Sequence, residues 1–176
     1  MNVMKVKVVL CFVLFFSADV YSAPSYQLIV HKAKRRMELF RNDSLIKIYK
    51  IALGLKPSGQ KEKRGDYKTP EGKYYIYNKN PHSQFYMAFN VSYPNSDDAK
   101  RGLTSGIISK KEYNTIVAAN TAKKTPPQNT GLGGDICIHG RGTASDWTWG
   151  CVALEDTDIK ELFAILPVRT PVTIRP

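Results

Sequence analysis

Two segments of the chain hold side chains that could carry out covalent catalysis. His139 is followed by Gly140, and Cys151 is preceded by Gly150. A thiol becomes a strong nucleophile only after it loses its proton, and a neighbouring imidazole can accept that proton. The pair therefore indicates a nucleophile at Cys151 and a general base at His139, provided that the fold brings the two side chains together.

The glycines beside these residues fit the same chemistry. Gly140 and Gly150 have no Cβ, so we expect the backbone there to approach a bound substrate closely. Backbone N–H groups around Cys151 could then stabilise the oxyanion of an acyl-transfer intermediate. One cysteine and one histidine twelve positions apart are by themselves a weak signal.

The N-terminal segment has the layout of a secretory signal peptide over residues 1–22. Lysines precede an apolar run over residues 8–16, and small residues lead to an expected cleavage after Ser22. The run is short for a membrane span, and an uncleaved anchor is the alternative. We therefore expect a catalytic domain over residues 23–176, located in the periplasm or cell envelope. Contact with the membrane would occur only through the signal peptide before cleavage.

The charge of the chain narrows the classes of partner. It has 26 Lys and Arg against 15 Asp and Glu, and cleavage after Ser22 would leave 24 against 14. A strongly positive field favours anionic partners, and for an exported protein the expected one is an acidic wall polymer. The basic residues do not alternate with stacking aromatic residues, so we expect no nucleic-acid partner.

The cysteines leave a second interpretation open. Cys137 and Cys151 are the two cysteines after the signal peptide, and an even number in an oxidising compartment ordinarily favours a disulfide. A structural or regulatory bridge is therefore an alternative to a free nucleophile. A zinc site at Cys137, His139 and Cys151 is not expected, because the spacing fits no usual pattern and a fourth ligand is missing. We expect no metal and no cofactor.

The elements that must position these residues are predicted to be mostly strands. Apolar residues that alternate or run together predict strands around residues 26–30, 37–39, 44–53, 74–77, 85–92, 135–139, 148–154 and 172–174. Asn42 and Asp43 predict a hairpin turn, and residues 56–72 predict a charged loop.

Two helices interrupt the strands. Ser109 and Glu112 form a capping-box pattern for a helix that runs to Ala122. A second helix is expected to begin near Asp156 or Asp158 and to end before Pro167. Together, these strands and helices predict one mainly β domain with two or three helices, folded as a sandwich or barrel.

The two catalytic segments together resemble a known family. His139-Gly140, followed by Thr148-Trp149-Gly150-Cys151, is similar to the His-Gly and Ser/Thr-x-Gly-Cys signature of the L,D-transpeptidase (YkuD-type) catalytic domain. The segments 65–72, 92–95 and 134–136 look like the exported YafK-like branch of that family. The resemblance covers most of the chain after the signal peptide.

This resemblance implies a mostly β catalytic domain that acts on peptidoglycan stem peptides, in wall synthesis and cell shape. Cys151 would attack the amide after the L-centre of diaminopimelate and form a thioester, with His139 acting as base and then as acid. An amine that resolves the thioester gives a cross-link. Water would make the protein a hydrolase that trims stems or cuts a wall cross-link or wall–protein link. The non-catalytic alternative is a wall-binding module stapled by a disulfide.

Other residues around the motifs are expected to bind the substrate or the oxyanion, namely Gly140, Arg141, Thr148, Trp149, Gly150 and Tyr93. Arg141 and Arg64 suit a substrate carboxylate because a guanidinium can form two parallel hydrogen bonds, and the alternative is that both are surface residues. Two positions depart from the commonest family pattern. Ala153 replaces a frequent arginine, and Trp149 replaces a frequent histidine.

Overall fold

A computed structural model describes residues 25–176, so the expected signal peptide lies outside the described residues. The described chain forms eight strands and three helices: β1 (Tyr26–His31), β2 (Arg36–Arg41), β3 (Ser44–Lys50), β4 (Gly72–Ser83), β5 (Tyr86–Val91), α1 (Ser96–Thr104), α2 (Lys110–Thr121), β6 (Cys137–His139), β7 (Val152–Ala153), α3 (Asp156–Ile165) and β8 (Pro171–Arg175). Within residues 25–176, no helix is both long and apolar enough to cross a membrane.

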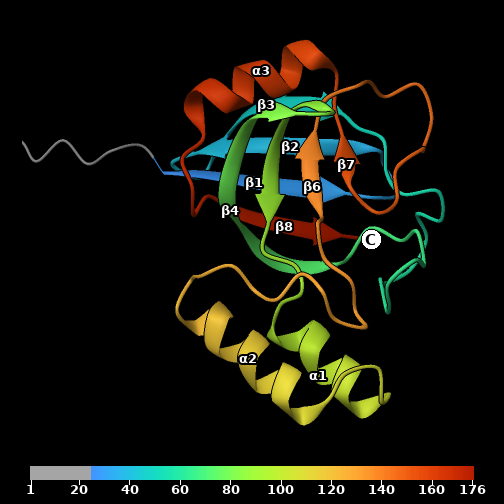
Figure 1. Ribbon diagram of the computed structural model, residues 1–176. Helices are drawn as coiled ribbons and strands as arrows, with labels where there is room; N and C mark the ends of the chain where they lie inside the picture. The colour runs from blue at the N-terminus through green and yellow to red at the C-terminus, as the bar shows by residue number, and fades with distance from the viewer. Residues whose placement is uncertain (1–24) are drawn as a thin grey trace, which may run out of the picture.

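The strands form one curled sheet in the order β3-β2-β1-β8-β4-β5-β6-β7 (Figure 1). β8 pairs in parallel with β1 and antiparallel with β4. It therefore joins the N-terminal strands to those that carry the candidate catalytic residues. In Figure 1, α3 lies on one side of the sheet, while α1 and α2 lie together at the opposite end. The predicted mainly β fold with two or three helices is confirmed.

β1 follows the predicted alternation closely, whereas β3 reverses it, because Ile46 and Ile48 are each 49% exposed and Tyr49 is buried. Leu28 and Val30 on β1 and Leu39 on β2 are almost completely buried, as expected where every second side chain faces the core. β2 continues into β3 through Asn42 and Asp43, whose φ angles are 49° and 64°. Two consecutive positive φ angles are typical of the type I′ hairpin turn that these residue types predict.

The first two helices, α1 and α2, each begin at a capping box. In α2, as predicted, Ser109 Oγ accepts from the Glu112 N–H at 3.2 Å, and the Glu112 carboxylate accepts from the Ser109 N–H at 2.7 Å. In α1 the same exchange joins Asn95 and Asp98, at 2.8 and 2.9 Å. The sequence does not predict α1, because Ala99 is the only apolar residue buried in it and the helical apolar period is missing.

The strands nearest the candidate active site differ from the prediction. β4 does not end at Tyr77 but runs to Ser83, because its pairing with β5 extends to the hairpin itself. The predicted strand over residues 148–154 is reduced to two residues. Its first residue instead forms backbone hydrogen bonds with Leu53 and Leu55, at 2.9–3.1 Å, and the chain turns there.

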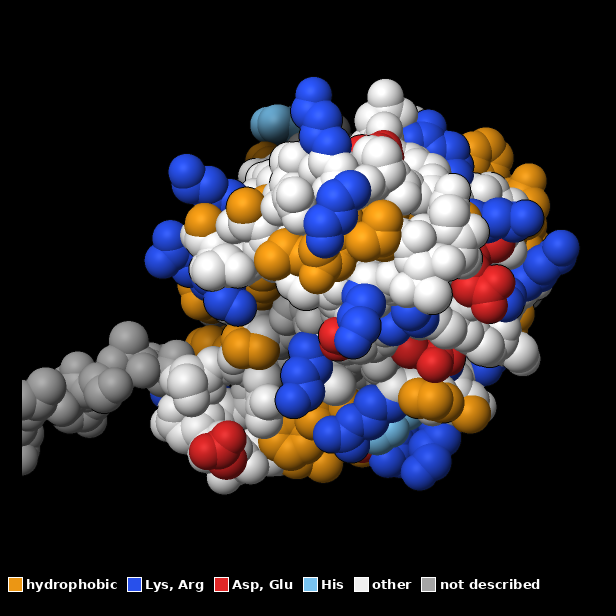
Figure 2. Space-filling view, turned by 90° about the horizontal axis from the view of Figure 1, so that it is seen from below, with side chains coloured by type: hydrophobic (Ala, Val, Ile, Leu, Met, Phe, Trp, Pro, Cys, Tyr) orange, Lys and Arg blue, Asp and Glu red, His pale blue; other side chains and the backbone are white. Residues whose placement is uncertain are grey.

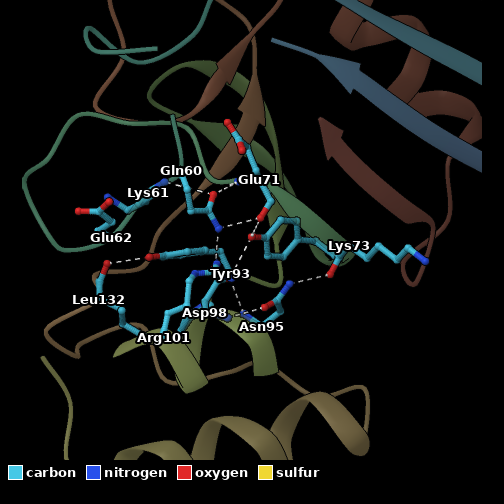
Figure 3. A network of polar contacts seen from close by, with 12 residues as sticks. Gln60, Lys61, Glu62, Glu71, Lys73, Tyr93, Asn95, Asp98, Arg101 and Leu132 are labelled. Carbon is cyan, nitrogen blue, oxygen red and sulfur yellow. Dashed lines mark hydrogen bonds and ion pairs between the residues drawn. The ribbon is translucent and has the colours of Figure 1, made fainter. Parts of the chain in front are cut away.

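A buried carboxylate fixes the charged loop over residues 56–71 to the sheet and to α1 (Figure 3). Asp98 is 1% exposed and accepts hydrogen bonds from Gln60 Nε2 in the loop at 3.0 Å and from the Tyr74 hydroxyl on β4 at 2.9 Å. It also forms an ion pair with Arg101. Burial raises the pKa of Asp98 to about 6. A single side chain thus joins the loop, the sheet and the helix.

Replacing this carboxylate tests its role in stability. We expect Asp98→Ala to lower the free energy of unfolding by ~2–4 kcal/mol, because the Tyr74 and Gln60 donors lose their acceptor. Asp97→Ala is the matched control, since it removes an exposed carboxylate from the same helical turn and should cost less than ~1 kcal/mol. Urea denaturation measures both. Equal losses would mean that helix charge, and not the buried network, accounts for the effect.

Candidate active site

Two short parallel strands bring the candidate nucleophile and base together. The register of β6 and β7 sets Ile138 beside Val152 and His139 beside Ala153. Cys151 directly precedes β7. The Cys137 N–H donates to Cys151 Sγ at 3.3 Å. Both cysteines are free thiols. The segments that carry His139 and Cys151 therefore meet at one edge of the sheet.

The ring of His139 is buried and held from several sides. It stacks on Phe85 with centroids 4.6 Å apart and meets Trp147 edge-on at 5.5 Å. Its Nδ1 lies 2.7 Å from the carbonyl oxygen of Gly140. Because a carbonyl can only accept, Nδ1 carries the proton, and Nε2 keeps the lone pair that can take a proton from Cys151.

The surroundings of Cys151 are those of an activated thiol. The hydrogen bond from the Cys137 thiol, together with the hydrogen bond and charge of His139, holds the pKa of Cys151 well below its ordinary range, although burial acts in the opposite direction. The same thiol–thiol contact and burial raise the pKa of Cys137. Of the two cysteines, Cys151 is therefore the one that ionises first, as a nucleophile requires.

Thr148 fixes the turn that precedes Cys151. Its Oγ1 donates to the carbonyl oxygen of Cys151 at 2.8 Å and accepts from the Gly150 N–H at 3.2 Å. The Gly150 N–H, one of the expected oxyanion donors, is thus already engaged. Thr148 is 3% exposed and holds the geometry of the backbone that carries the sulfur.

The glycines of the two motifs are required by packing within the protein. A Cβ at Gly140 would lie 2.4 Å from Asp156 Oδ1, and one at Gly150 would lie 2.7 Å from the carbonyl oxygen of Lys68. Gly150 also has a φ of 129°, which side-chain-bearing residues rarely adopt. The space beside each glycine is therefore filled by neighbouring protein atoms, and not left open for a substrate as the sequence suggested.

A cavity of about 890 Å³ opens beside Cys151 and His139. Its volume is in the range of small-molecule binding sites. The walls are formed by the charged loop, the segment 128–136 and the turn before Cys151. Tyr67 and Trp149 line it with their rings edge-on, 6.4 Å apart. Within residues 25–176, no group of three or more His, Cys, Asp or Glu side chains could hold a metal ion.

The structure brings only some of the predicted substrate-binding residues to this cavity. Thr148 and Trp149 line it, and Trp149 is 79% exposed. Arg141 lines a second cavity of about 550 Å³, which shares Phe85 and Trp147 with the first. The Arg141 side chain points to the carbonyl oxygen of Gln84, at 3.4 Å.

Tyr93 is placed in the core. It is fully buried, and its hydroxyl donates to the carbonyl oxygen of Leu132 at 3.0 Å, so it supports the cavity wall from behind (Figure 3). By contrast, Phe85 lines the cavity and is not identified by the motifs. In sequence it is only the start of a predicted strand, and no local signal shows that it will stack on His139.

The short loop between the two motifs is anchored by Asp146. Its carboxylate accepts from Arg35 Nε and Nη2, at 3.0 and 2.7 Å to Oδ2, and from the Leu53 N–H at 2.8 Å. The neighbouring Trp147 is thereby held against His139. Arg35 belongs to the turn between β1 and β2, so a residue more than a hundred positions away helps to fix the candidate base.

Comparisons with known proteins agree with this arrangement. A family profile described as the L,D-transpeptidase catalytic domain, YkuD, matches residues 25–174. YafK of Escherichia coli (strain K12), named as a candidate L,D-transpeptidase, is 29% identical over 93 residues, which are 49% of this chain and 37% of that protein.

Solved structures share the fold. A variant of the helical cell shape determining protein Pgp2 from Campylobacter jejuni is 25% identical with a TM-score of 0.60, over 88% of this chain and 48% of that one. An L,D-transpeptidase from Mycobacterium smegmatis is 8% identical with a TM-score of 0.52, over 87% of this chain and 59% of that one. The chain thus spans about half or less of YafK and Pgp2. Since the family profile covers nearly all of the described residues, the chain belongs to the YkuD family of L,D-transpeptidase catalytic domains.

Proposed function

We propose that this protein is an exported cysteine L,D-transpeptidase that acts on peptidoglycan stem peptides. The observation that carries the proposal is the pairing of Cys151, a thiol of lowered pKa, with a buried His139 whose Nε2 is free to accept a proton. Both line a cavity large enough for part of a peptide. Membership of the YkuD family supports acyl transfer as the reaction.

In the first half-reaction, His139 takes the thiol proton and the Cys151 sulfur attacks the amide carbonyl carbon after the L-centre of diaminopimelate. A C–S bond forms and the carbonyl oxygen becomes an oxyanion. The C–N bond then breaks, and His139 returns the proton to the leaving amine. The products are a thioester on Cys151 and a released D-residue.

In the second half-reaction, an amine of another stem peptide gives its proton to His139 and attacks the thioester. A C–N bond forms, the C–S bond breaks and Cys151 regains its proton, which leaves a cross-link. Water in place of the amine gives hydrolysis. A non-catalytic, disulfide-stapled module is less well supported, because both thiols are free and the pKa of Cys151 is lowered.

Incubation with purified peptidoglycan, followed by mass analysis of the muropeptides, tests the reaction and the roles of the two thiols. We expect new cross-links or shortened stems with the wild type, and none with Cys151→Ser. Cys137→Ala should keep most of the turnover but need a higher pH, because the hydrogen bond that lowers the pKa of Cys151 is lost. Equal loss in both variants would indicate an essential disulfide instead.

The pH dependence of Cys151 alkylation tests whether His139 is the general base. Because the pKa of Cys151 is lowered, iodoacetamide should react at full rate below the pH that an ordinary thiol needs, near ~8.5. His139→Ala removes one cause of that lowering, so the profile should move to higher pH and acylation should slow by roughly 10²–10⁴-fold. The exposed His82, changed to Ala, is the control and should alter neither. Near-normal alkylation and conversion in His139→Ala would remove His139 from the mechanism.

Export is supported by the basic and apolar layout of residues 1–22. We expect the protein recovered from the cell envelope to begin at Ala23 or within a residue or two of it. N-terminal sequencing of that protein decides the point. An intact Met1 would contradict cleavage and favour the membrane-anchored alternative.

A further inference from the structure

Two charged residues that line the cavity form no ion pair within the described part of the chain. Three charged residues line it, Lys61, Arg64 and Asp135. Lys61 forms an ion pair with Asp66 at 2.7 Å. Among residues 25–176, Arg64 and Asp135 take part in no ion pair, although salt bridges elsewhere in the described chain are numerous. Both residues are exposed, so a ligand in the cavity can reach one positive and one negative residue.

Arg64 is held in place without losing its charge. Its Nη2 donates to Asn129 Oδ1 at 2.6 Å and to the carbonyl oxygen of Thr130 at 3.0 Å, and its own N–H donates to the Gly131 carbonyl at 2.9 Å. All of these acceptors are neutral, so the guanidinium is oriented while its positive charge remains uncompensated. An oriented guanidinium is suited to a carboxylate.

The backbone of Asp135 lies directly beside the nucleophile. Its carbonyl oxygen lies 3.5 Å from Cys151 Sγ, and its N–H donates to Gln128 Oε1 at 2.7 Å. Its φ of 55° is in the left-handed region, so the predicted strand over residues 135–139 starts only at Cys137. Asp tolerates this conformation better than most residues, and such conformations concentrate at functional sites.

The two charged residues lie on adjoining walls. A Cβ at Gly133, two positions before Asp135, would meet the Cα of Arg64 at 3.3 Å. The charged loop therefore packs against the segment that leads to the nucleophile. Elsewhere, basic side chains are spread over the surface and not gathered in one patch on the face shown in Figure 2. Discrimination between substrates would then depend on charges inside the cavity.

We propose that Arg64 and Asp135 form a subsite for an α-amino acid zwitterion, with Arg64 binding the carboxylate and Asp135 the ammonium group. The inference rests on the proposed function, in which the bound residue is diaminopimelate. That residue carries a free amine and a free carboxylate at its D-centre while its L-centre carbonyl is attacked by Cys151. Arg64 would thereby supply a cation to the cavity, whereas Ala153, at the position of the family's frequent arginine, is fully buried and does not line it.

Three donor tetrapeptides test whether the cavity recognises the charged groups of the third residue or binds any stem peptide equally well. They carry at the third position meso-diaminopimelate, its form amidated at the D-centre carboxylate, or L-lysine, which keeps the amine but has no carboxylate. We expect the wild type to convert the first peptide with a kcat/KM about 10- to 100-fold above the other two, the usual effect of one charged hydrogen-bonded pair. The difference should be found mainly in KM.

Variants of Arg64 and Asp135 test which substrate group each of the two residues binds. Arg64→Gln should lose about 10- to 100-fold on the diaminopimelate peptide and convert it no better than the amidated one, and Arg64→Lys should recover part of the loss. Asp135→Asn should lower kcat/KM for all three peptides, since each keeps the amine. Lys63→Gln is the control, because Lys63 neighbours Arg64 but does not line the cavity, and it should match the wild type.

Alkylation of Cys151 by iodoacetamide, which is neutral, should be unchanged in Arg64→Gln and so show that the nucleophile and fold are intact. A wild type that converts the three peptides equally well would overturn the subsite and leave the proposed function standing. The same holds if Arg64→Gln keeps the wild-type preference. A wild type that converts none of them would overturn the proposed function and the subsite with it.

Discussion

The parallel pairing of β6 with β7 is the interaction on which the candidate active site depends. The two strands are only three and two residues long, so their own pairing is weak. It is reinforced because Ala153 exchanges two backbone hydrogen bonds with Ala52, at 2.8 and 3.0 Å, and because the Leu154 N–H donates to the carbonyl oxygen of His139 at 2.8 Å. Backbone hydrogen bonds therefore set the position of the imidazole relative to the sulfur, which is the kind of rigid support that proton transfer needs.

A second level of support is polar and comes from distant parts of the chain. Asp98 holds the charged loop against β4 and α1, and Asp146 holds the loop between the motifs against the turn after β1. Each carboxylate accepts from at least two elements. The walls of the cavity are therefore fixed by a few side chains, while Arg64 and Asp135, which line it, form no ion pair within residues 25–176.

The sequence predicted the features that local interactions determine. The hairpin at Asn42 and the helix that begins at Ser109 depend on short motifs with a direct physical meaning. The roles of Cys151 and His139 are instead expected from the family resemblance and stay a prediction. The stacking of Phe85 on His139 could not be predicted, because it depends on the register of β5 with β6.

Other differences between the prediction and the structure arise where contacts between residues distant in sequence determine the local structure. Tyr93 lies in a segment that resembles the family, yet it is buried in the core. Its hydroxyl donates there to the carbonyl oxygen of Leu132. The helix α1 has a clear capping box but almost no apolar face, and it is held instead by the network around Asp98. Gly140 is required by Asp156, which comes sixteen residues later. None of these contacts has a signature in the local sequence.

The position of β8 in the sheet affects when, during synthesis, the domain can assemble. Residues 171–175 are the last strand of the described chain to be synthesised, yet they lie between β1 and β4 and join the two halves of the sheet. Until that strand is available, β1 and β4 lack the edge through which they join, and the halves meet through isolated bridges such as the one between Ala52 and Ala153. In a chain exported as proposed, the order of synthesis would therefore delay assembly of the cavity until almost the whole domain has been made.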